Sequence, residues 1–314
     1  MKITWLSCLF CLAALPSLAT ELKEAELASD LIPKPVPYAV LLPDDYQSDG
    51  APLPLLLLLH GGGGDRKYLA SMRPSIEELW KAGKLPKMVV ATPSVASRCF
   101  YMDYRDGSEK WESFLIGPFR KHLQQTYNTS PDPKKNLLMG ISMGGMGCLR
   151  IGFKHPELFG GLAAMEPGIE PILHWKDMQP RHRFWRDDSL FEAAFGKPVD
   201  AAYWEANNPA SIAKASPAKI SGSGLQIYLD CGDEDMFLLF EGSEFLHRIL
   251  YDLGIKHEYH LVRGADHLGR TVRPRSQEAL QFLSRVLNPP PTVDPAAEPM
   301  RKVLAPSKAK AGVK

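Results

Sequence analysis

The alternation of short apolar runs with longer amphipathic stretches constrains the fold of this chain more than any other feature. The runs at residues 53–59 (LPLLLLL), 88–93 (MVVATP) and 136–141 (NLLMGI) are unbroken rather than alternating with polar residues. Strands that are covered by helices on both faces have this unbroken pattern. The segments between them, 68–83 and 108–127, have the spacing of amphipathic helices. The sequence therefore predicts an α/β fold with a mainly parallel sheet and helices on both faces.

The same alternation continues through the second half of the chain without an internal repeat. Further strands and helices are expected at 159–165, 224–232, 236–254, 256–264 and 273–287. The composition, 45% hydrophobic and 23% charged, is typical of soluble globular proteins, so we predict one α/β domain over residues 20–288. A formal net charge of +1 gives no bias toward nucleic acid or a membrane surface, and neither is expected as a partner.

The first 19 residues have the pattern of a secretory signal peptide. One lysine precedes an apolar stretch, and Pro16, Ser17 and Ala19 are spaced as at a cleavage site. The apolar stretch is shorter than the roughly 20 residues that a membrane-spanning helix needs, so no membrane anchor is expected. The mature protein is therefore predicted to begin near Thr20 and to be secreted or periplasmic.

The other end of the chain, residues 289–314, is rich in proline, alanine and lysine and has no periodic apolar face. This composition is typical of disordered segments, and a disordered tail is predicted. Contact with an acidic partner is the alternative function for its lysines, Lys302, Lys308, Lys310 and Lys314.

Three cysteines remain after the predicted signal peptide, and they are Cys99, Cys148 and Cys231. An odd number without close spacing predicts neither a disulfide framework nor a zinc site. Cys148 and Cys231 are expected to be small buried hydrophobic residues, and a disulfide that involves Cys99 stays open as the alternative.

A serine interrupts the third of the early apolar runs. Residues 137–147 read LLMGISMGGMG, with Ser142 between Gly140 and Gly144. In a parallel sheet, a strand that enters a helix through Gly-x-Ser-x-Gly places the serine hydroxyl on a sharp turn at the carboxyl edge. The residues on either side supply the strand and the helix that this motif needs. Ser142 is therefore predicted to be a nucleophile.

A serine nucleophile needs a base to remove its proton and an acid to orient that base. His267 is the predicted base, because it follows a late strand in the order Ser, Asp, His that α/β-hydrolases use. For the acid, the GDED segment at 232–235 offers Asp233 and Asp235, and we choose Asp235, with Asp233 shaping the turn. Asp230 is expected inside the strand, and Asp266 would have to fold back to reach the adjacent ring.

Attack by serine places negative charge on the carbonyl oxygen, which preorganised backbone N–H groups stabilise. One expected donor is Met143, the residue after the nucleophile. The other is expected in the loop HGGGG at 60–64, since glycines allow the backbone to approach a ligand closely.

With these motifs the chain resembles the esterase D group of α/β-hydrolases, which includes S-formylglutathione hydrolases, secreted feruloyl and acetyl-xylan esterases, and mycolyltransferases. The resemblance rests on LHGGGGD (59–65), YRDGSEKWESFL (104–115), residues 140–161, LDCGDEDMF (229–237) and GADH (264–267). It implies the α/β-hydrolase fold, ester or thioester chemistry, and a triad at Ser142, Asp235 and His267. It also implies Gly62 as the second oxyanion donor, with Gly61 or Gly63 as alternates. An intracellular S-formylglutathione hydrolase carries no signal peptide, so that activity is not expected.

The function predicted from the sequence is therefore a secreted serine esterase that hydrolyses carboxylic esters through an acyl-enzyme. The expected substrate is a small-molecule or carbohydrate ester, with a carbohydrate-linked or aromatic acyl group. The mature part lacks HExxH, a Cys/His set at zinc spacing and a GxGxxG opening, so neither a metal nor a cofactor is expected. An acyltransferase of the same fold and a non-catalytic binding protein are the alternatives.

The stretch 166–217 separates two predicted core strands and is far longer than the ~2 to 6 residues usual in α/β units. We expect a helical insert that borders the site, with Trp175 and Trp185 as substrate-binding residues. Flat aromatic surfaces suit sugar rings or aromatic acyl groups. The alternative is that these aromatic residues form a small core beneath the insert. Three arginines of the insert are expected to meet a carboxylate or to face water, Arg181, Arg183 and Arg186.

Overall fold

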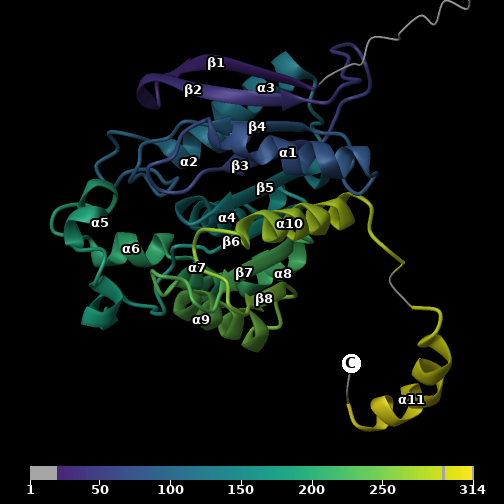
Figure 1. The fold of residues 1–314 in the computed structure, drawn as a ribbon. Helices are drawn as coiled ribbons and strands as arrows, with labels where there is room; N and C mark the ends of the chain where they lie inside the picture. The colour runs from purple at the N-terminus through teal and green to yellow at the C-terminus, as the bar shows by residue number, and fades with distance from the viewer. Residues whose placement is uncertain (1–19, 292–293, 313–314) are drawn as a thin grey trace, which may run out of the picture.

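The structure of the protein is a computed structural model that describes residues 20–291 and 294–312. The predicted signal peptide lies outside the described residues. Eight strands form one sheet in the order β1-β2-β4-β3-β5-β6-β7-β8 (Figure 1). The strands are β1 (Glu21–Ser29), β2 (Ile32–Leu42), β3 (Leu55–Leu59), β4 (Val89–Pro93), β5 (Asn136–Ile141), β6 (Gly161–Met165), β7 (Gln226–Gly232) and β8 (Glu258–Val262).

The sheet is parallel from β4 to β8, which confirms the mainly parallel sheet that the sequence predicts. β1 and β2 add an antiparallel pair at one edge, and β2 also pairs with β4 in antiparallel orientation. Strand β1 has alternating exposure instead of an unbroken apolar run, as a half-solvated edge strand requires.

The unbroken leucine run of β3 is explained by two core layers. Leu55, Leu57 and Leu59 belong to one layer, whereas Leu56 and Leu58 belong to the layer on the opposite face. Successive side chains of a strand point to opposite faces, so a strand buried on both sides needs apolar residues at every position.

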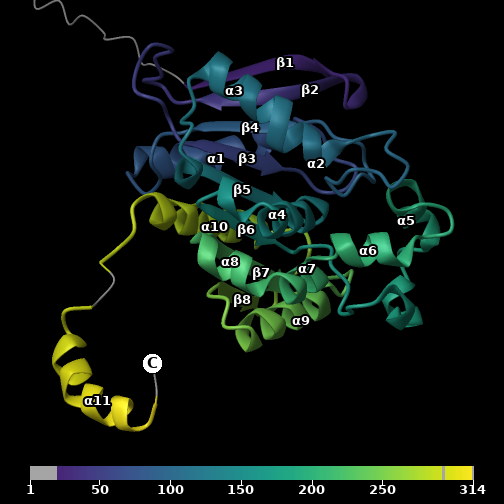
Figure 2. The same cartoon turned by 180° about the vertical axis from the view of Figure 1, so that it is seen from behind.

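Helices cover both faces of the sheet (Figures 1 and 2). One face is covered by α1 (Tyr68–Lys81) and α10 (Val272–Leu287), whose buried side chains join the layer of Leu56 and Leu58. The other face is covered by helices that include α2 (Trp111–Phe114), α3 (Arg120–Tyr127), α4 (Met143–Lys154) and α9 (Leu239–Asp252). A π-helical turn, η1 (Leu115–Phe119), joins α2 to α3, and short 3₁₀ turns precede β5 and β6, η2 (Pro133–Lys135) and η3 (Pro156–Leu158).

The long connection between β6 and β7 is folded into short helices, which agrees with the expected helical insert. In chain order these are η4 (Trp175–Asp177), η5 (Pro180–Arg183), α5 (Asp188–Phe195), α6 (Ala201–Asn207), α7 (Pro209–Ala215) and α8 (Pro217–Ser223). Helices α5 and α6 project at the left side of Figure 1, whereas α7 packs against α4 and α9.

The three cysteines of the predicted mature protein lie within the described residues. Cys99, Cys148 and Cys231 are buried free thiols, so the expectation of small buried hydrophobic residues is confirmed and Cys99 forms no disulfide among the described residues.

Within residues 20–291 and 294–312, no helix has the length and apolar character needed to cross a membrane.

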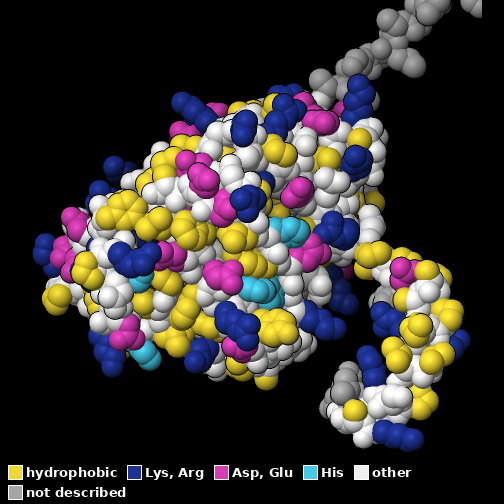
Figure 3. Space-filling view, turned by 60° about the horizontal axis from the view of Figure 1, so that its bottom comes forward, with side chains coloured by type: hydrophobic (Ala, Val, Ile, Leu, Met, Phe, Trp, Pro, Cys, Tyr) yellow, Lys and Arg dark blue, Asp and Glu magenta, His cyan; other side chains and the backbone are white. Residues whose placement is uncertain are grey.

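The C-terminal segment differs from the predicted disordered tail, because the structure forms a helix there, α11 (Glu298–Lys310). Alanine, lysine, glutamate and methionine are good helix formers, and local propensity explains a helix without a core face. None of its residues is buried, and Met300, Val303 and Leu304 are exposed. The helix stands apart from the domain, with apolar side chains and Lys or Arg interspersed along it (Figure 3).

Candidate active site

Ser142 lies at the corner between β5 and α4, where the sequence motif predicts it. Its backbone has φ 57° and ψ −118°, a conformation that is strained for a residue with a side chain and that persists only when the surroundings enforce it. Its N–H donates to the Met165 carbonyl at 2.9 Å, and its own carbonyl accepts from Gly168 at 3.1 Å. A Cβ on Gly144 would overlap the Leu59 carbonyl, so only glycine permits this close crossing of helix and strand.

His267 and Asp235 come from loops that follow neighbouring strands and are in direct contact. Asp235 follows β7, His267 follows β8, and the His267 Nδ1 to Asp235 Oδ2 distance is 2.7 Å. Both side chains are buried. Because a carboxylate only accepts, the ring carries its proton on Nδ1, and Nε2 is left as the atom that can take up a proton. Backbone N–H groups of Phe237 and Leu239 donate to the other oxygen, Oδ1, at 2.8 and 3.4 Å.

The other aspartates considered from the sequence have different partners. Asp233 accepts from the Gly264 N–H at 2.6 Å, which ties the loop after β7 to the loop after β8. Asp266 accepts from the backbone N–H groups of Met236 at 2.8 Å and His267 at 2.7 Å. Asp230 lies buried within β7. Of these four aspartates, Asp235 is the one in contact with the His267 ring, whereas Asp233 links the two loops.

The glycine loop after β3 passes beside Ser142. A Cβ built on Gly61 would lie 3.4 Å from the Ser142 Cβ, whereas the position on Gly62 lies nearest to the Ser97 carbonyl at 3.8 Å. Gly63 has φ +73°, which favours glycine. Met143, the first residue of α4, has an N–H without a partner inside its own helix, as at every helix start. The assignment of Met143 and Gly62, with Gly61 and Gly63 as alternates, as oxyanion donors stays a prediction.

His60 holds the start of this loop in place. It is fully buried, its Nδ1 lies 2.8 Å from the Gly61 carbonyl, and its Nε2 accepts from the Val95 N–H at 3.2 Å. The Tyr101 hydroxyl donates to the His60 carbonyl at 2.9 Å. Burial lowers the pKa of His60, so the ring is neutral and serves as a hydrogen-bonded spacer.

Glu166 is a site residue that the sequence analysis named only as the start of the insert. It follows β6 directly, is fully buried, and places Oε2 3.2 Å from His267 Nδ1. Its other oxygen is ion-paired with Arg275 of α10, and Arg275 Nη2 in turn lies 2.8 Å from Asp230 Oδ1. Its position directly after a core strand is the signal in the sequence that could have identified it.

The ligand atoms of Glu166, Asp235 and His267 lie within 4.8 Å of one another, as the donors of a metal site do. The Arg275 guanidinium already neutralises Glu166, and His267 Nδ1 carries a proton toward Asp235. A metal ion would have to displace that proton and approach the guanidinium charge. The group therefore fits a network of hydrogen bonds and ion pairs better than a metal site.

Trp185 is connected to the candidate triad through Phe237, which the sequence analysis did not single out. The ring centroids of Trp185 and Phe237 are 4.7 Å apart, and the Phe237 and His267 rings are also 4.7 Å apart with an edge-to-face geometry. The Trp185 indole donates to the Phe237 carbonyl at 3.1 Å. Trp185 is 36% exposed, so part of its surface is available to a ligand.

Trp175 has a different environment. Its ring packs against Phe191 at 5.2 Å and Trp204 at 5.6 Å, inside the aromatic core of the insert. The three arginines of the insert are paired with carboxylates, Arg181 with Glu241, Arg183 with Asp188 and Arg186 with Glu170. The structure thus brings Trp185 toward His267. Trp175 instead packs within a small aromatic core of the insert, which was the alternative to substrate binding.

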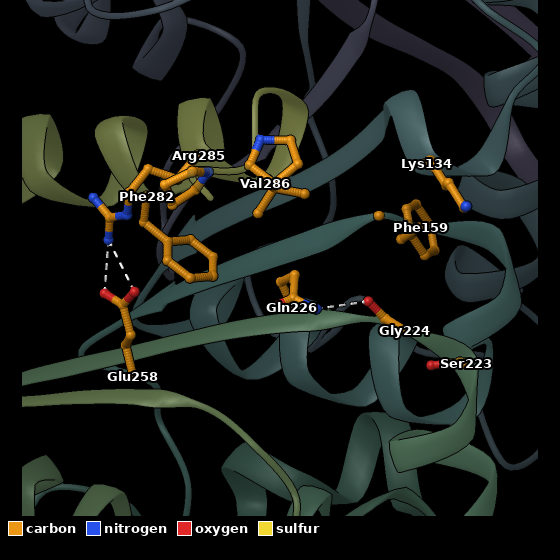
Figure 4. Close-up of a pocket in the computed structure, with 12 residues that line it drawn as sticks. Lys134, Phe159, Ser223, Gly224, Gln226, Glu258, Phe282, Arg285 and Val286 are labelled. Atoms are coloured by element: carbon orange, nitrogen blue, oxygen red, sulfur yellow. Dashed lines mark hydrogen bonds and ion pairs between the residues drawn. The ribbon is translucent and has the colours of Figure 1, made fainter. Parts of the chain in front are cut away.

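A pocket of about 500 Å³ lies at the opposite end of the parallel strands (Figure 4). Gly160, Gln226 and Glu258, which line it, precede or begin β6, β7 and β8. Ser142, Asp235 and His267 follow the carboxyl ends of their strands, where open α/β sheets bind their ligands. The pocket of Figure 4 is therefore separate from the candidate active site.

The sheet order, the serine corner after β5, and the Asp and His loops after β7 and β8 define an α/β-hydrolase. A comparison with family models agrees with this class, since the model described as Putative esterase matches residues 29–266. The chain therefore belongs to the Putative esterase family.

Individual relatives are distant. The chain is 26% identical over 261 residues to Esterase Rv1288 of Mycobacterium tuberculosis, across 75% of this chain and 52% of that protein, so it spans about half the length of this relative. It is 27% identical to an acetyl esterase of Caldicellulosiruptor saccharolyticus, across 62% of this chain and 71% of that protein. Among solved structures, a ferulic acid esterase superposes with a TM-score of 0.71 at 20% identity, covering 86% of this chain and 99% of the other.

Proposed function

We propose that the protein is a secreted serine esterase that hydrolyses carboxylic esters through Ser142, His267 and Asp235. The observation that carries this proposal is the 2.7 Å contact between His267 Nδ1 and Asp235 Oδ2, at the sheet edge where Ser142 forms its strained corner. Membership of an esterase family supports the same class of reaction.

In the proposed mechanism, His267 Nε2 removes the Ser142 hydroxyl proton as Oγ attacks the ester carbonyl. Asp235 keeps the Nδ1 proton in place and stabilises the imidazolium that forms. N–H groups of Met143 and of the loop at 60–64 bind the developing oxyanion, each donor contributing on the order of 100- to 1,000-fold in rate. The protonated ring then delivers its proton to the leaving alcohol, and water hydrolyses the acyl-enzyme by the same steps in reverse order.

For the substrate, we favour carbohydrate-linked or aromatic acyl esters. An exposed indole face beside Phe237 suits a planar acyl group or a sugar ring, and the relatives include an acetyl esterase and a ferulic acid esterase. No cofactor takes part in the proposed reaction.

The test is turnover of p-nitrophenyl acetate and of a feruloyl ester by the purified protein. The wild-type protein is expected to release the alcohol product, and Ser142→Ala is expected to release none. Complete absence of turnover on short-chain and aromatic esters would favour a non-catalytic binding protein. An acyltransferase is distinguished by adding a sugar or alcohol acceptor, because a transferase forms the new ester in preference to the free acid.

Trp185→Ala is expected to raise the KM for a feruloyl ester about tenfold, while the kinetics on p-nitrophenyl acetate stay within about twofold, since a small acyl group does not reach the indole. Steady-state kinetics on both esters measure this. Phe184→Ala is the matched control, because Phe184 is an adjacent aromatic residue that is 59% exposed. Equal losses on both esters in Trp185→Ala, with unchanged thermal stability, would show that this residue does not select the substrate.

Secretion is a separate part of the proposal and rests on the first 19 residues. We expect natively expressed protein to begin near Thr20, because the small residues before it have the spacing of a cleavage site. Intact-mass spectrometry measures the N-terminus. Recovery of protein that retains Met1 would contradict the proposed compartment.

A further inference from the structure

Two carboxylates face the same nitrogen of His267. Asp235 Oδ2 is the hydrogen-bond acceptor at 2.7 Å, and Glu166 Oε2 lies 3.2 Å from the same Nδ1. Among the described residues, no donor is hydrogen bonded to Glu166 Oε2, although the atom is buried. Burying a carboxylate oxygen without a hydrogen-bond donor costs free energy, so an interaction with the neighbouring His267 ring is expected to offset that cost.

Glu166 is held rigidly from the side away from the ring. Arg275 pairs with its Oε1, and Arg275 is fixed by Asp230 through contacts of 2.8 Å from Nη2 and 3.3 Å from Nε. The Tyr228 hydroxyl donates to Asp230 at 3.2 Å. The backbone of Glu166 is fixed as well, because its N–H donates to the Asp230 carbonyl at 2.8 Å and its φ is 44°.

We propose that Glu166 is a second carboxylate for His267, a positioning residue that holds the ring together with Asp235 and stabilises its protonated form during ester hydrolysis. The proposal rests on the proposed function of the Ser142 site. In the neutral ring, the Nδ1 N–H donates its hydrogen bond to Asp235, and Glu166 lies beside it as a second possible acceptor. Once Nε2 has taken the serine proton, both carboxylates face the positive ring.

The electrostatic surroundings set the pH range of this role. Burial raises the pKa of Glu166 to about 7, against the lowering influence of Arg275 and His267, so the carboxylate is mostly charged above that pH and its effect on the ring is greatest there. The other charged or titratable groups that face Glu166 and His267 come from several elements: Asp230 and Cys231 of β7, Asp235 after β7, Arg275 of α10 and Tyr68 of α1. The positive charge of Arg275 offsets the negative charge of one of these carboxylates, and the positive charge of the protonated His267 ring offsets that of another.

Glu166→Gln is the test, because it keeps the shape and removes the charge. A negative charge beside a histidine raises its pKa, so removal should lower the pKa of His267, by about one unit. We expect the same downward shift in the acid limb of kcat/KM, with kcat about tenfold lower and KM within about twofold. Adding Glu166→Gln to Asp235→Asn should cost about another tenfold, since no carboxylate then remains beside Nδ1 to stabilise the protonated ring.

The pKa of His267 is read from NMR titration of the full chain, with a His267→Gln spectrum to assign the resonance. Glu112→Gln is the matched control, because Glu112 is a buried glutamate that pairs with His155 at 2.9 Å and with Lys154, away from Ser142. The titration needs no turnover. A shifted His267 in a protein that hydrolyses no ester would therefore count against the proposed esterase and not against this pairing.

An unchanged pKa of His267 and an unchanged acid limb in folded Glu166→Gln would overturn the proposal. If that variant does not fold, Glu166→Asp gives the comparison, since the shorter side chain keeps its charge and withdraws it from Nδ1. The pKa of His267 is then expected to fall by a smaller amount, about half a unit. If His267 in Glu166→Asp titrated as it does in the wild type, the role assigned to Glu166 would likewise be contradicted.

Discussion

Replacement of Ser142 by alanine is expected to abolish ester hydrolysis, with kcat falling by about a millionfold as in other triad enzymes that lose their nucleophile. The hydroxyl stands on a partly exposed corner, and alanine removes a single oxygen without changing the backbone. Little packing is lost, so the thermal unfolding midpoint should stay within a few degrees of the wild type. Steady-state kinetics on p-nitrophenyl acetate and a calorimetric melt measure the two quantities.

A matched control is Ser97→Ala, which removes an exposed hydroxyl from the loop after β4. Wild-type rates are expected for that variant. If folded Ser142→Ala kept most of the wild-type turnover, the serine mechanism would be wrong. Triad knockouts retain a residual rate about 10³- to 10⁴-fold above the reaction in water, and this is the lowest rate expected for the variant.

Asp235→Asn is expected to have the next largest effect, a fall in kcat of about 10³- to 10⁴-fold. The amide can donate to Nδ1 and so favours the tautomer in which Nε2 carries the proton and cannot act as a base. The fall should be mainly in kcat, because Asp235 is buried behind the ring and away from the substrate. Asp233→Asn should cost less than about tenfold, since its amide oxygen can still accept from the Gly264 N–H.

These two variants are matched in charge and lie two residues apart in one loop. Steady-state kinetics with a common substrate rank them directly. The opposite ranking, with Asp233→Asn the slower enzyme at equal thermal stability, would transfer the role of the acid to Asp233.

The sequence predicted the fold because each core strand is buried on both faces and therefore shows an unbroken apolar run, as in β3 and β5. The positions of Ser142, Asp235 and His267 could be predicted for a related reason, since parallel strands bring their carboxyl ends to one edge. Strand β1 carries charged residues at most of its exposed positions and therefore shows no such run. Helix α11 could not be predicted from an apolar face, because it buries none of its residues.

The contacts that the sequence did not reveal all join segments far apart in the chain. Arg275 lies on the last core helix and meets Glu166 and Asp230 across two strands. Phe237 sits between Trp185 and His267, and its contacts depend on how the insert folds back over the loop after β7. Charged and aromatic residues in loops are common, so their spacing alone does not separate site residues from surface residues.

The hydrogen bond between the Trp185 indole and the Phe237 carbonyl has a consequence for how such enzymes diversify. The acceptor is a main-chain oxygen, which is present whatever side chain stands at that position. An altered insert can therefore keep its attachment to the catalytic loop as long as it offers one donor there. Under the proposed function, the insert that borders the substrate can change while Ser142, Asp235 and His267 keep their positions, so new specificities can arise without a new reaction.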